Sequence, residues 1–231
     1  MSLLKQDNQG GIRFEHSASH ITLTLPEPWP VLSSAVLNGG FSSIRSLLNL
    51  RVDQLAPPPW PPAQQTLQQQ AEQLMLPTPC CGMMTAASMR SLGYSSLSLQ
   101  QLRAECWVTA GLSNLRRSGD PADAFTGAGT INIWLLLHFP LTPAAMAEAL
   151  IQLTEAKVTA IRDAELLSPL SSLPASGTGT DSHAVICPPH TTPEQALAFC
   201  GKHTTAGELI GRVVLDACKQ SIGHCLRAAA H

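Results

Sequence analysis

Apolar and polar residues alternate in the first part of the chain. Residues 21–25 alternate between Ile or Leu and Thr, which predicts a strand with one buried face. We expect short strands at 12–15 and 20–25, joined by a Ser-Ala-Ser turn. A third strand is predicted at 31–37, ending at Asn38-Gly39-Gly40. The opening pattern therefore predicts a small β-sheet.

The pattern changes in the middle of the chain. Residues 51–79 are rich in proline and glutamine, and we expect an extended Pro-rich part followed by an amphipathic helix that Pro77 stops. Residues 83–92 predict a further helix. Residues 97–108 predict a strand or a short helix, and residues 131–137 predict a buried strand.

Helical spacing dominates the last third. Thr142-Pro143 predicts an N-cap with a first-turn proline, followed by a helix to about Glu165. A glycine- and threonine-rich loop then leads into a strand at 184–187, and we expect 196–200 to be its hairpin partner. The final helix is predicted to start near Ala206.

Strands come first and long helices last, without a regular strand–helix alternation. This order predicts an α+β fold in which several helices pack on a mixed β-sheet. A chain of 231 residues can bury a substantial core. We therefore expect a single globular domain over residues 1–231, with the Pro- and Gln-rich residues 51–79 as an excursion from it.

Composition argues against several classes of function. A net charge of −2 and an aromatic content of 4% do not suit nucleic acid or an anionic membrane as partner. The N-terminus lacks the apolar core of a signal peptide, and no apolar run is long enough to span a bilayer. We therefore expect a cytoplasmic protein without a membrane or nucleic-acid partner.

The cysteines favour buried thiols. There are seven, an odd number, and none form a Cys-x-x-Cys pair. Zinc ligand types do occur near the C-terminal end, at His183, Cys187, His190, Cys200 and His203, but inert core cysteines are the simpler interpretation. We expect neither a metal nor another cofactor bound by the protein itself.

Two segments carry a resemblance to a known family. GTGTDS at 177–182 and GKHTTAGELIG at 201–211 resemble segments of the adenosylcobinamide amidohydrolases of cobalamin salvage. Further upstream, LSSAVLNGG, CGMMTAA, VTAGLSNLRRSGDPA and GTINI are similar to that family's other blocks and follow the same order. The resemblance runs from about residue 32 to residue 222.

The resemblance implies hydrolysis of the amide that joins the aminopropanol arm, or its phosphate, to the corrin ring of adenosylcobinamide. The product would be adenosylcobyric acid, and cobalt is expected only in this small-molecule corrinoid substrate. Two other functions stay open: a corrinoid-binding protein without catalysis, and a self-processing hydrolase that acts on another amide. The sequence also leaves open an oligomer of identical chains.

Amide hydrolysis needs a base for water, donors for the oxyanion and an acid for the departing nitrogen. His203 precedes a predicted helix, whose positive end favours a neutral imidazole that can act as base and then acid. Asp181 could orient that imidazole or act as the base itself, and Lys202 or loop N–H groups could stabilise the oxyanion. A nucleophilic route through Thr180 or Ser182 is the alternative.

We expect Asp181 and His203 to act as a unit in the chemical step. The predicted hairpin between residues 184 and 200 would bring the two side chains together. Glu208 is the remaining catalytic candidate, although Thr205-x-x-Glu208 also fits a capping box.

A corrinoid is a broad disc with apolar faces and a fringe of neutral amides, so it needs an apolar floor and a rim of neutral hydrogen-bonding groups. The predicted rim residues occur at loop–strand junctions: Asn38, Gly39, Gly40, Asn114, Arg116, Arg117, Asp120, Thr130, Asn132, Gly177, Thr178, Gly179, Thr180 and Ser182. Tight turns are the alternative role for the glycines and asparagines. The arginine pair could hold a phosphate on the arm, or simply be solvated.

Overall fold

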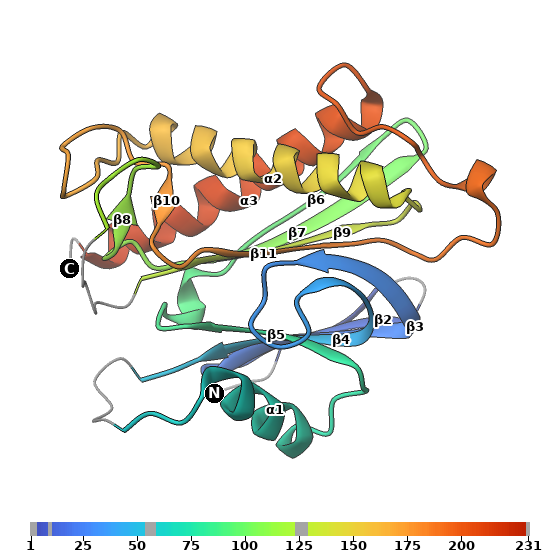
Figure 1. Ribbon diagram of the computed structural model, residues 1–231, viewed down its shortest axis with the longest axis horizontal. Helices are drawn as coiled ribbons and strands as arrows, with labels where there is room; N and C mark the ends of the chain where they lie inside the picture. Colours follow the sequence, from blue (N-terminus) through green and yellow to red (C-terminus); the bar gives the residue numbers. More distant parts are fainter. Residues whose placement is uncertain (1–3, 9–10, 54–58, 123–128, 230–231) are drawn as a thin grey trace.

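Two β-layers lie back to back at the centre of the molecule, with helices on their outer faces (Figure 1). The computed structural model describes residues 4–8, 11–53, 59–122 and 129–229. The first layer contains β6 (Gly93–Leu99), β7 (Leu102–Ala110), β9 (Ile131–Leu137) and β11 (Ser182–Ile186). The second contains β1 (Leu4–Asn8), β2 (Ile12–His16), β3 (His20–Ser33), β4 (Gly40–Arg51) and β5 (Cys80–Thr85).

Strand β3 joins the two layers into one nine-stranded mixed sheet among the described residues. Its first half pairs with β2, its last residues pair antiparallel with β11, and β4 pairs along most of its length. The register with β4 shifts between Thr24 and Trp29, where two prolines interrupt the strand. Strand β11 in turn runs parallel to β9, so the sheet contains both kinds of pairing.

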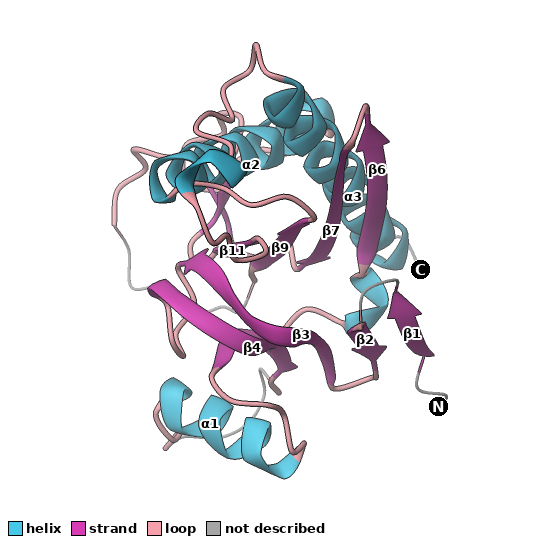
Figure 2. Cartoon of the chain, turned by 90° about the vertical axis from the view of Figure 1, so that its right-hand side faces the viewer, coloured by secondary structure: helices cyan, strands magenta, loops and turns pink. Residues whose placement is uncertain are grey.

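Among the residues that the structure describes, three α-helices cover the outer faces of the two layers (Figure 2). Helices α2 (Pro143–Asp163) and α3 (Thr205–Ala229) pack on the first layer, and α1 (Ala63–Gln73) packs on the second. The Thr142 hydroxyl accepts a hydrogen bond from the Ala145 amide at 3.2 Å, which caps α2. The remaining short elements are β8 (Leu115–Arg116), β10 (Gly177–Thr178), η1 (Met89–Ser91) and η2 (Pro193–Gln195).

Successive side chains of a strand point to opposite faces of the sheet, so the apolar core is divided into clusters on the two sides of the first layer. In β9, Ile133 and Leu135 face α2 and α3, whereas Trp134 and Leu136 face the second layer. A third cluster lies between α1 and the outer face of β4. Because both faces of the first layer are buried, β9 is apolar throughout except at Asn132.

The α+β fold with a mixed sheet and helices packed on it is confirmed. The Gln-rich helix, the helix after Thr142, the strand at 131–137 and the strands at 12–15 and 20–25 are all present, with shifted ends. Residues 97–108 belong to a hairpin of two strands, β6 and β7. No helix in the described part of the chain is both long and apolar enough to cross a bilayer.

Two predictions about single elements were wrong, and one strand was missed. Residues 83–92 are not a helix but the end of β5 followed by η1, because a short apolar run buried on both faces has no distinctive periodicity. The separate strand at 31–37 is the end of β3, which stops at Ser33, and β4 was not predicted at all. The proline break at residues 26–30 bends β3 rather than ending it.

The hairpin between 184–187 and 196–200 is also absent. Strand β11 has β3 on one side and β9 on the other, so neither of its edges is available. Residues 196–200 instead form a connection into α3, whose first turn is capped by Thr204 rather than Thr205: the Gly207 amide donates to Thr204 Oγ1 at 2.9 Å.

Candidate functional site

A group of polar side chains gathers where β9 and β11 begin. We call Thr130, Lys157, Thr178, Asp181 and His183 the Asp181 cluster. The Asp181 carboxylate accepts hydrogen bonds from Lys157 Nζ at 2.5 Å, from the Ile131 amide at 3.0 Å, and from both the amide and the hydroxyl of Thr178. The side chains of Lys157 and Asp181 are only 7% and 9% exposed. This is a buried ion pair whose carboxylate is well supplied with donors.

Glycines allow the loop before Asp181 to pack against its neighbours. A Cβ atom at Gly177 would lie 2.2 Å from Asp181 Oδ2, and one at Gly179 would lie 2.9 Å from Asn114 Nδ2. The Gly179 amide donates to the Asn114 carbonyl at 3.2 Å, and β10 pairs with β8. The glycine–threonine repeat is therefore required for close approach of protein side chains.

Threonines join this loop to the start of β9. Thr130 Oγ1 donates to the Thr180 carbonyl at 3.1 Å, and Thr180 Oγ1 donates to the Gly129 carbonyl at 2.9 Å. Together with Asn114 and Asp181, these contacts bring three predicted segments, 111–120, 129–132 and 177–182, to one end of the first layer. Residues 123–128, between the first and the second of these segments, lie outside the described residues.

His183 adds an imidazole to the cluster. It is 8% exposed, and its Nε2 atom has no hydrogen-bond partner among the residues that the structure describes. Burial, reinforced by the charge of Lys157, lowers the His183 pKa to about 4, although Asp181 acts in the opposite direction. The imidazole is therefore neutral near pH 7.

A second polar group lies on the opposite face of the same strands, between the two β-layers. Thr109, Asn132 and Ser182 are register neighbours across β7, β9 and β11, and we call them the polar row. Asn49 of β4 reaches across from the second layer and donates to Thr109 Oγ1 at 2.7 Å. Asn132 Nδ2 donates to Asn49 Oδ1 at 2.8 Å and to the Met84 carbonyl at 2.9 Å. Hydrogen bonds thus tie the layers together at this point.

The predicted arginine pair lies beside these groups, in the β8 region. Arg116 Nη1 donates to the Leu115 carbonyl at 2.8 Å, and Arg117 Nη1 donates to the Pro174 carbonyl at 3.0 Å. Asp120 accepts from the Arg117 amide and from the Ser168 hydroxyl, and these bonds lower its pKa. The side chains of Arg117 and Asp120 therefore hold the 115–120 loop against the segment before β10.

A tight turn at Asn38, Gly39 and Gly40 leads into β4. Asn38 and Gly40 have φ angles of 53° and 85°, and Asn38 Nδ2 donates to the Cys80 carbonyl at 2.7 Å. Asn38 lines a groove of about 350 Å³ between this turn and α1. The turn interpretation accounts for the geometry of this segment.

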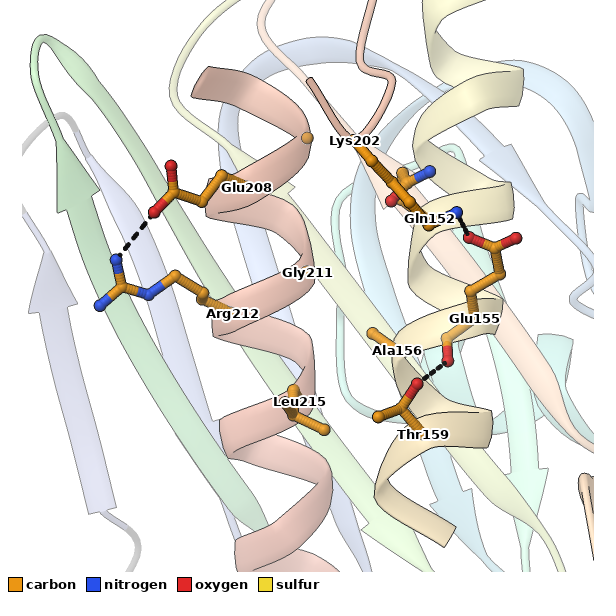
Figure 3. Close-up of a pocket in the computed structure, with 10 residues that line it drawn as sticks. Gln152, Glu155, Ala156, Thr159, Lys202, Glu208, Gly211, Arg212 and Leu215 are labelled. Atoms are coloured by element: carbon orange, nitrogen blue, oxygen red, sulfur yellow. Dashed lines mark hydrogen bonds and ion pairs between the residues drawn. The ribbon is translucent and has the colours of Figure 1, made fainter. Parts of the chain in front are cut away.

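Lys202 and Glu208 lie in a different place again, a groove of about 460 Å³ between α2 and α3 (Figure 3). Lys202 forms an ion pair with Glu155, and Glu208 forms one with Arg212 at 3.0 Å. All four side chains are about half exposed or more. These are surface ion pairs on the outside of the helical layer.

The structure does not bring Asp181 and His203 together. His203 is exposed and precedes the first residue of α3, Thr205. The charges of Asp181 and Lys157 act on Cys218, which lies 218 − 205 = 13 residues further along that helix, or about 20 Å at 1.5 Å per residue. Figure 1 shows the same separation, with the start of α3 and strand β10 toward opposite ends of the molecule.

Two members of the cluster, Lys157 and His183, were not predicted as site residues. Lys157 lies four residues after Leu153 and four before Ile161, both fully buried, so it occupies the apolar stripe of its helix. A lysine on such a stripe is a signal that sequence analysis could have used. His183 sits beside Asp181 in the sequence, but its burial depends on the position of α2.

Cys187 and Cys200, two of the possible zinc ligands, are free and buried thiols. Burial raises the pKa of Cys187 to about 11 and that of Cys200 to about 12, so both are protonated near pH 7. In the described ranges, no three His, Cys, Asp or Glu side chains are grouped so that they could hold a metal ion.

Comparison with known proteins identifies the family. The family model described as adenosylcobinamide amidohydrolase matches residues 5–230. The chain belongs to the adenosylcobinamide amidohydrolase family. An adenosylcobinamide amidohydrolase of Methanosarcina mazei is 27% identical over 195 residues, covering 82% of this chain and 88% of the relative.

Three further proteins are similar to this member of the adenosylcobinamide amidohydrolase family, either over a shorter part of the chain or at much lower sequence identity. An uncharacterized protein of Methanocaldococcus jannaschii is 38% identical over 87 residues, which are 37% of this chain and only about a third, 32%, of the relative. The PH0078 protein from Pyrococcus horikoshii OT3 has 8% identity and a TM-score of 0.44, over 97% of this chain and 83% of that one. An l-aminopeptidase d-ala-esterase/amidase from Ochrobactrum anthropi has 9% identity and a TM-score of 0.40, over 98% and 82% of the two chains.

Proposed function

We propose that this protein hydrolyses the amide between the aminopropanol arm and the corrin ring of adenosylcobinamide, giving adenosylcobyric acid. The observation that carries the proposal is the family match over residues 5–230. The convergence of segments 111–120, 129–132 and 177–182 at one end of the first β-layer supports it, because hydrolysis needs several polar groups in one place.

In this proposal the Asp181 cluster is the reaction centre. The Asp181 carboxylate already accepts several hydrogen bonds, so its role is to hold Lys157 and the glycine–threonine loop in position. The ammonium group of Lys157, held in a site with little water, stabilises the negative charge that develops on the carbonyl oxygen. Lys157 thus takes the role that the sequence had suggested for Lys202.

The proton is handled by His183 in the same scheme. Its imidazole is neutral near pH 7 and its Nε2 atom has no partner in the described chain, so it can accept a proton from the attacking water. The resulting imidazolium can return that proton to the departing nitrogen of the aminopropanol arm. An imidazolium beside Lys157 is unfavourable, which drives the return step.

The experiment is to incubate the purified chain with adenosylcobinamide and to separate the products by chromatography. Adenosylcobyric acid and free aminopropanol should form in equal amounts. His183→Gln, with its fold checked by circular dichroism, should lower turnover on the order of 10²-fold or more, as removal of a general base does. Corrinoid that stays bound without any acid being formed would contradict the proposal and identify a binding protein.

The choice of arm is tested in the same assay. Arg116 and Arg117 both donate to backbone carbonyls, and the five N–H donors of a guanidinium suit it to bind a phosphate as well. Rates with and without phosphate on the aminopropanol arm show which substrate is preferred. Intact-mass measurement of the same sample detects cleavage of the chain, which a self-processing hydrolase would require.

A further inference from the structure

The orientation of one buried amide in the polar row is decided by its neighbours. Asn132 is 2% exposed, and its Nδ2 atom lies 2.9 Å from the Met84 carbonyl. A carbonyl oxygen only accepts hydrogen bonds, so the atom that faces it must be the nitrogen. The second N–H of Asn132 is used by Asn49 Oδ1 at 2.8 Å. Both donors are therefore occupied within the protein.

The remaining atom of this amide, Asn132 Oδ1, is a buried acceptor that has no donor among the described residues. Its register neighbour on β11 is Ser182, whose Oγ atom is also buried and also has no partner in the described part of the chain. The next pair toward the middle of these strands is Trp134 and Ala184; both are buried, and the indole Nε1 of Trp134 likewise has no partner among the described residues. Nearly all buried polar atoms in folded proteins have partners, so two neighbouring exceptions indicate a ligand group.

We propose that Asn132 and Ser182 bind a neutral carboxamide. The N–H of the carboxamide donates to Asn132 Oδ1, and its carbonyl oxygen accepts the hydroxyl hydrogen of Ser182. The pair offers one fixed acceptor and one hydroxyl donor, which is the complement of an amide edge. Naming this ligand as a side chain of the corrin rim rests on the proposed function, whereas the binding of a carboxamide does not.

The fixed acceptor also makes the site selective. A carboxylate has no N–H to offer, and its negative charge would face Asn132 Oδ1 at close range. Asn132 cannot turn its nitrogen toward such a ligand, because that would break its bonds to both Met84 and Asn49. A corrinoid with an acid in place of this amide should therefore bind much more weakly.

The test uses small probes and does not depend on turnover. The full ¹⁵N-labelled chain is titrated with propionamide and, separately, with sodium propionate, while the NMR signals of Ser182 and of the Asn132 side-chain amide are followed. Propionamide should shift these signals in a saturable manner. Propionate should bind at least about tenfold more weakly, because it cannot make the bond to Asn132 and repels it.

The variants separate a binding role from a structural one. Changes at Asn132 would remove two interlayer hydrogen bonds and destabilise the fold, so Ser182→Ala is the informative substitution. It should weaken propionamide binding about three- to tenfold, the effect of losing one neutral hydrogen bond. Ser43→Ala, at an exposed serine of β4, is the matched control and should leave the affinity unchanged.

Three outcomes would overturn the inference: no saturable shift with propionamide, equal affinity for propionate, or unchanged affinity in Ser182→Ala. Turnover of adenosylcobinamide is measured on the same protein sample. Hydrolysis without a response to propionamide would overturn this inference and leave the proposed function standing. A response to propionamide without hydrolysis would contradict the proposed function and support the carboxamide site.

Discussion

Glu155 and Lys157 stand two residues apart on α2 and form two very different ion pairs. Glu155 faces outward and pairs with Lys202, with the two side chains 49% and 64% exposed. Lys157 faces inward and pairs with Asp181, with the two side chains 7% and 9% exposed. The sequence analysis had placed Asp181 and Lys202 in one site, whereas the helix separates them.

The comparison shows that burial, and not residue type, distinguishes the two lysines. Water screens a surface pair, and ordering two long side chains costs most of what the attraction contributes. An inward-facing pair has little water near it, so each charge is stabilised by its partner and not by solvent. We therefore expect changes on the inner side of α2 to have large effects and changes on its outer side to have small ones.

Lys157→Met should have the largest effect on stability. The substitution keeps the length and apolar character of the side chain but leaves the Asp181 carboxylate buried without its cation. Breaking a buried pair in this way costs roughly 3–5 kcal/mol in the free energy of unfolding. Denaturant unfolding followed by circular dichroism measures the loss. A loss below about 1 kcal/mol would show that the pair is solvated and that the comparison fails.

The stability contributed by His183 should depend on pH. Its pKa is near 6.5 when unfolded and about 4 in the folded chain, so the unfolded state binds the proton more readily. Stability is therefore fully present above pH 6.5, falls as the pH is lowered through 6.5 to about 4, and then levels off. The total loss is about 3 kcal/mol.

Urea unfolding of the wild type and of His183→Gln at pH 7, 5.5 and 4 isolates this contribution from that of the carboxylates. The difference between the two proteins should shrink as the pH falls. His203→Gln provides the control, because His203 is exposed. A His183→Gln difference that is the same at every pH would contradict the predicted low pKa.

Lys202→Met should change stability by no more than about 1 kcal/mol, and less at high salt, because its pair with Glu155 is largely exposed. The same denaturant experiment at low and high ionic strength measures both quantities. A loss comparable to that of Lys157→Met would remove the distinction between the two sides of α2.

The smallest expected effect is the coupling between Asp181 and His203. Since His203 lies just before α3 and Asp181 acts on Cys218, about 20 Å from the start of that helix, their effects on turnover should be independent. His203→Ala should leave turnover within about twofold of the wild type, and the double variant with Asp181→Asn should match the sum of the single changes to within about 0.5 kcal/mol. Strong non-additivity would restore the original hypothesis that they act as a unit.

The sequence predicted elements well where one residue pattern has one structural solution. Thr142-Pro143 begins a helix, and the apolar run from Ile131 forms a buried strand. The prediction failed where the structure depends on the pairing of strands that are far apart in the sequence. Nothing local shows that β11 lies between β3 and β9, and this placement abolishes the hairpin that would have carried His203 to Asp181.

The same contrast between local pattern and tertiary pairing applies to the candidate site. The segments of Asn114, Thr130 and Asp181 were predicted to gather, and they do so through hydrogen bonds. Lys202, His203 and Glu208 are sequence neighbours of one another, but the connection after β11 carries them to the outer side of the helices. Lys157 was not predicted, because lysines of surface helices usually point into solvent.

The position of β11 has a consequence for how the chain assembles during its synthesis. Residues 20–33 and 131–137 are made early and midway, but the strand that joins them, residues 182–186, leaves the ribosome late. Until then β3 and β9 each have an unpaired edge, and such edges readily pair with other chains. Until residues 182–186 have been synthesised, the nascent chain therefore holds two incomplete sheets whose open edges must not pair with other chains. Strand β11 then pairs with both edges and joins the two sheets.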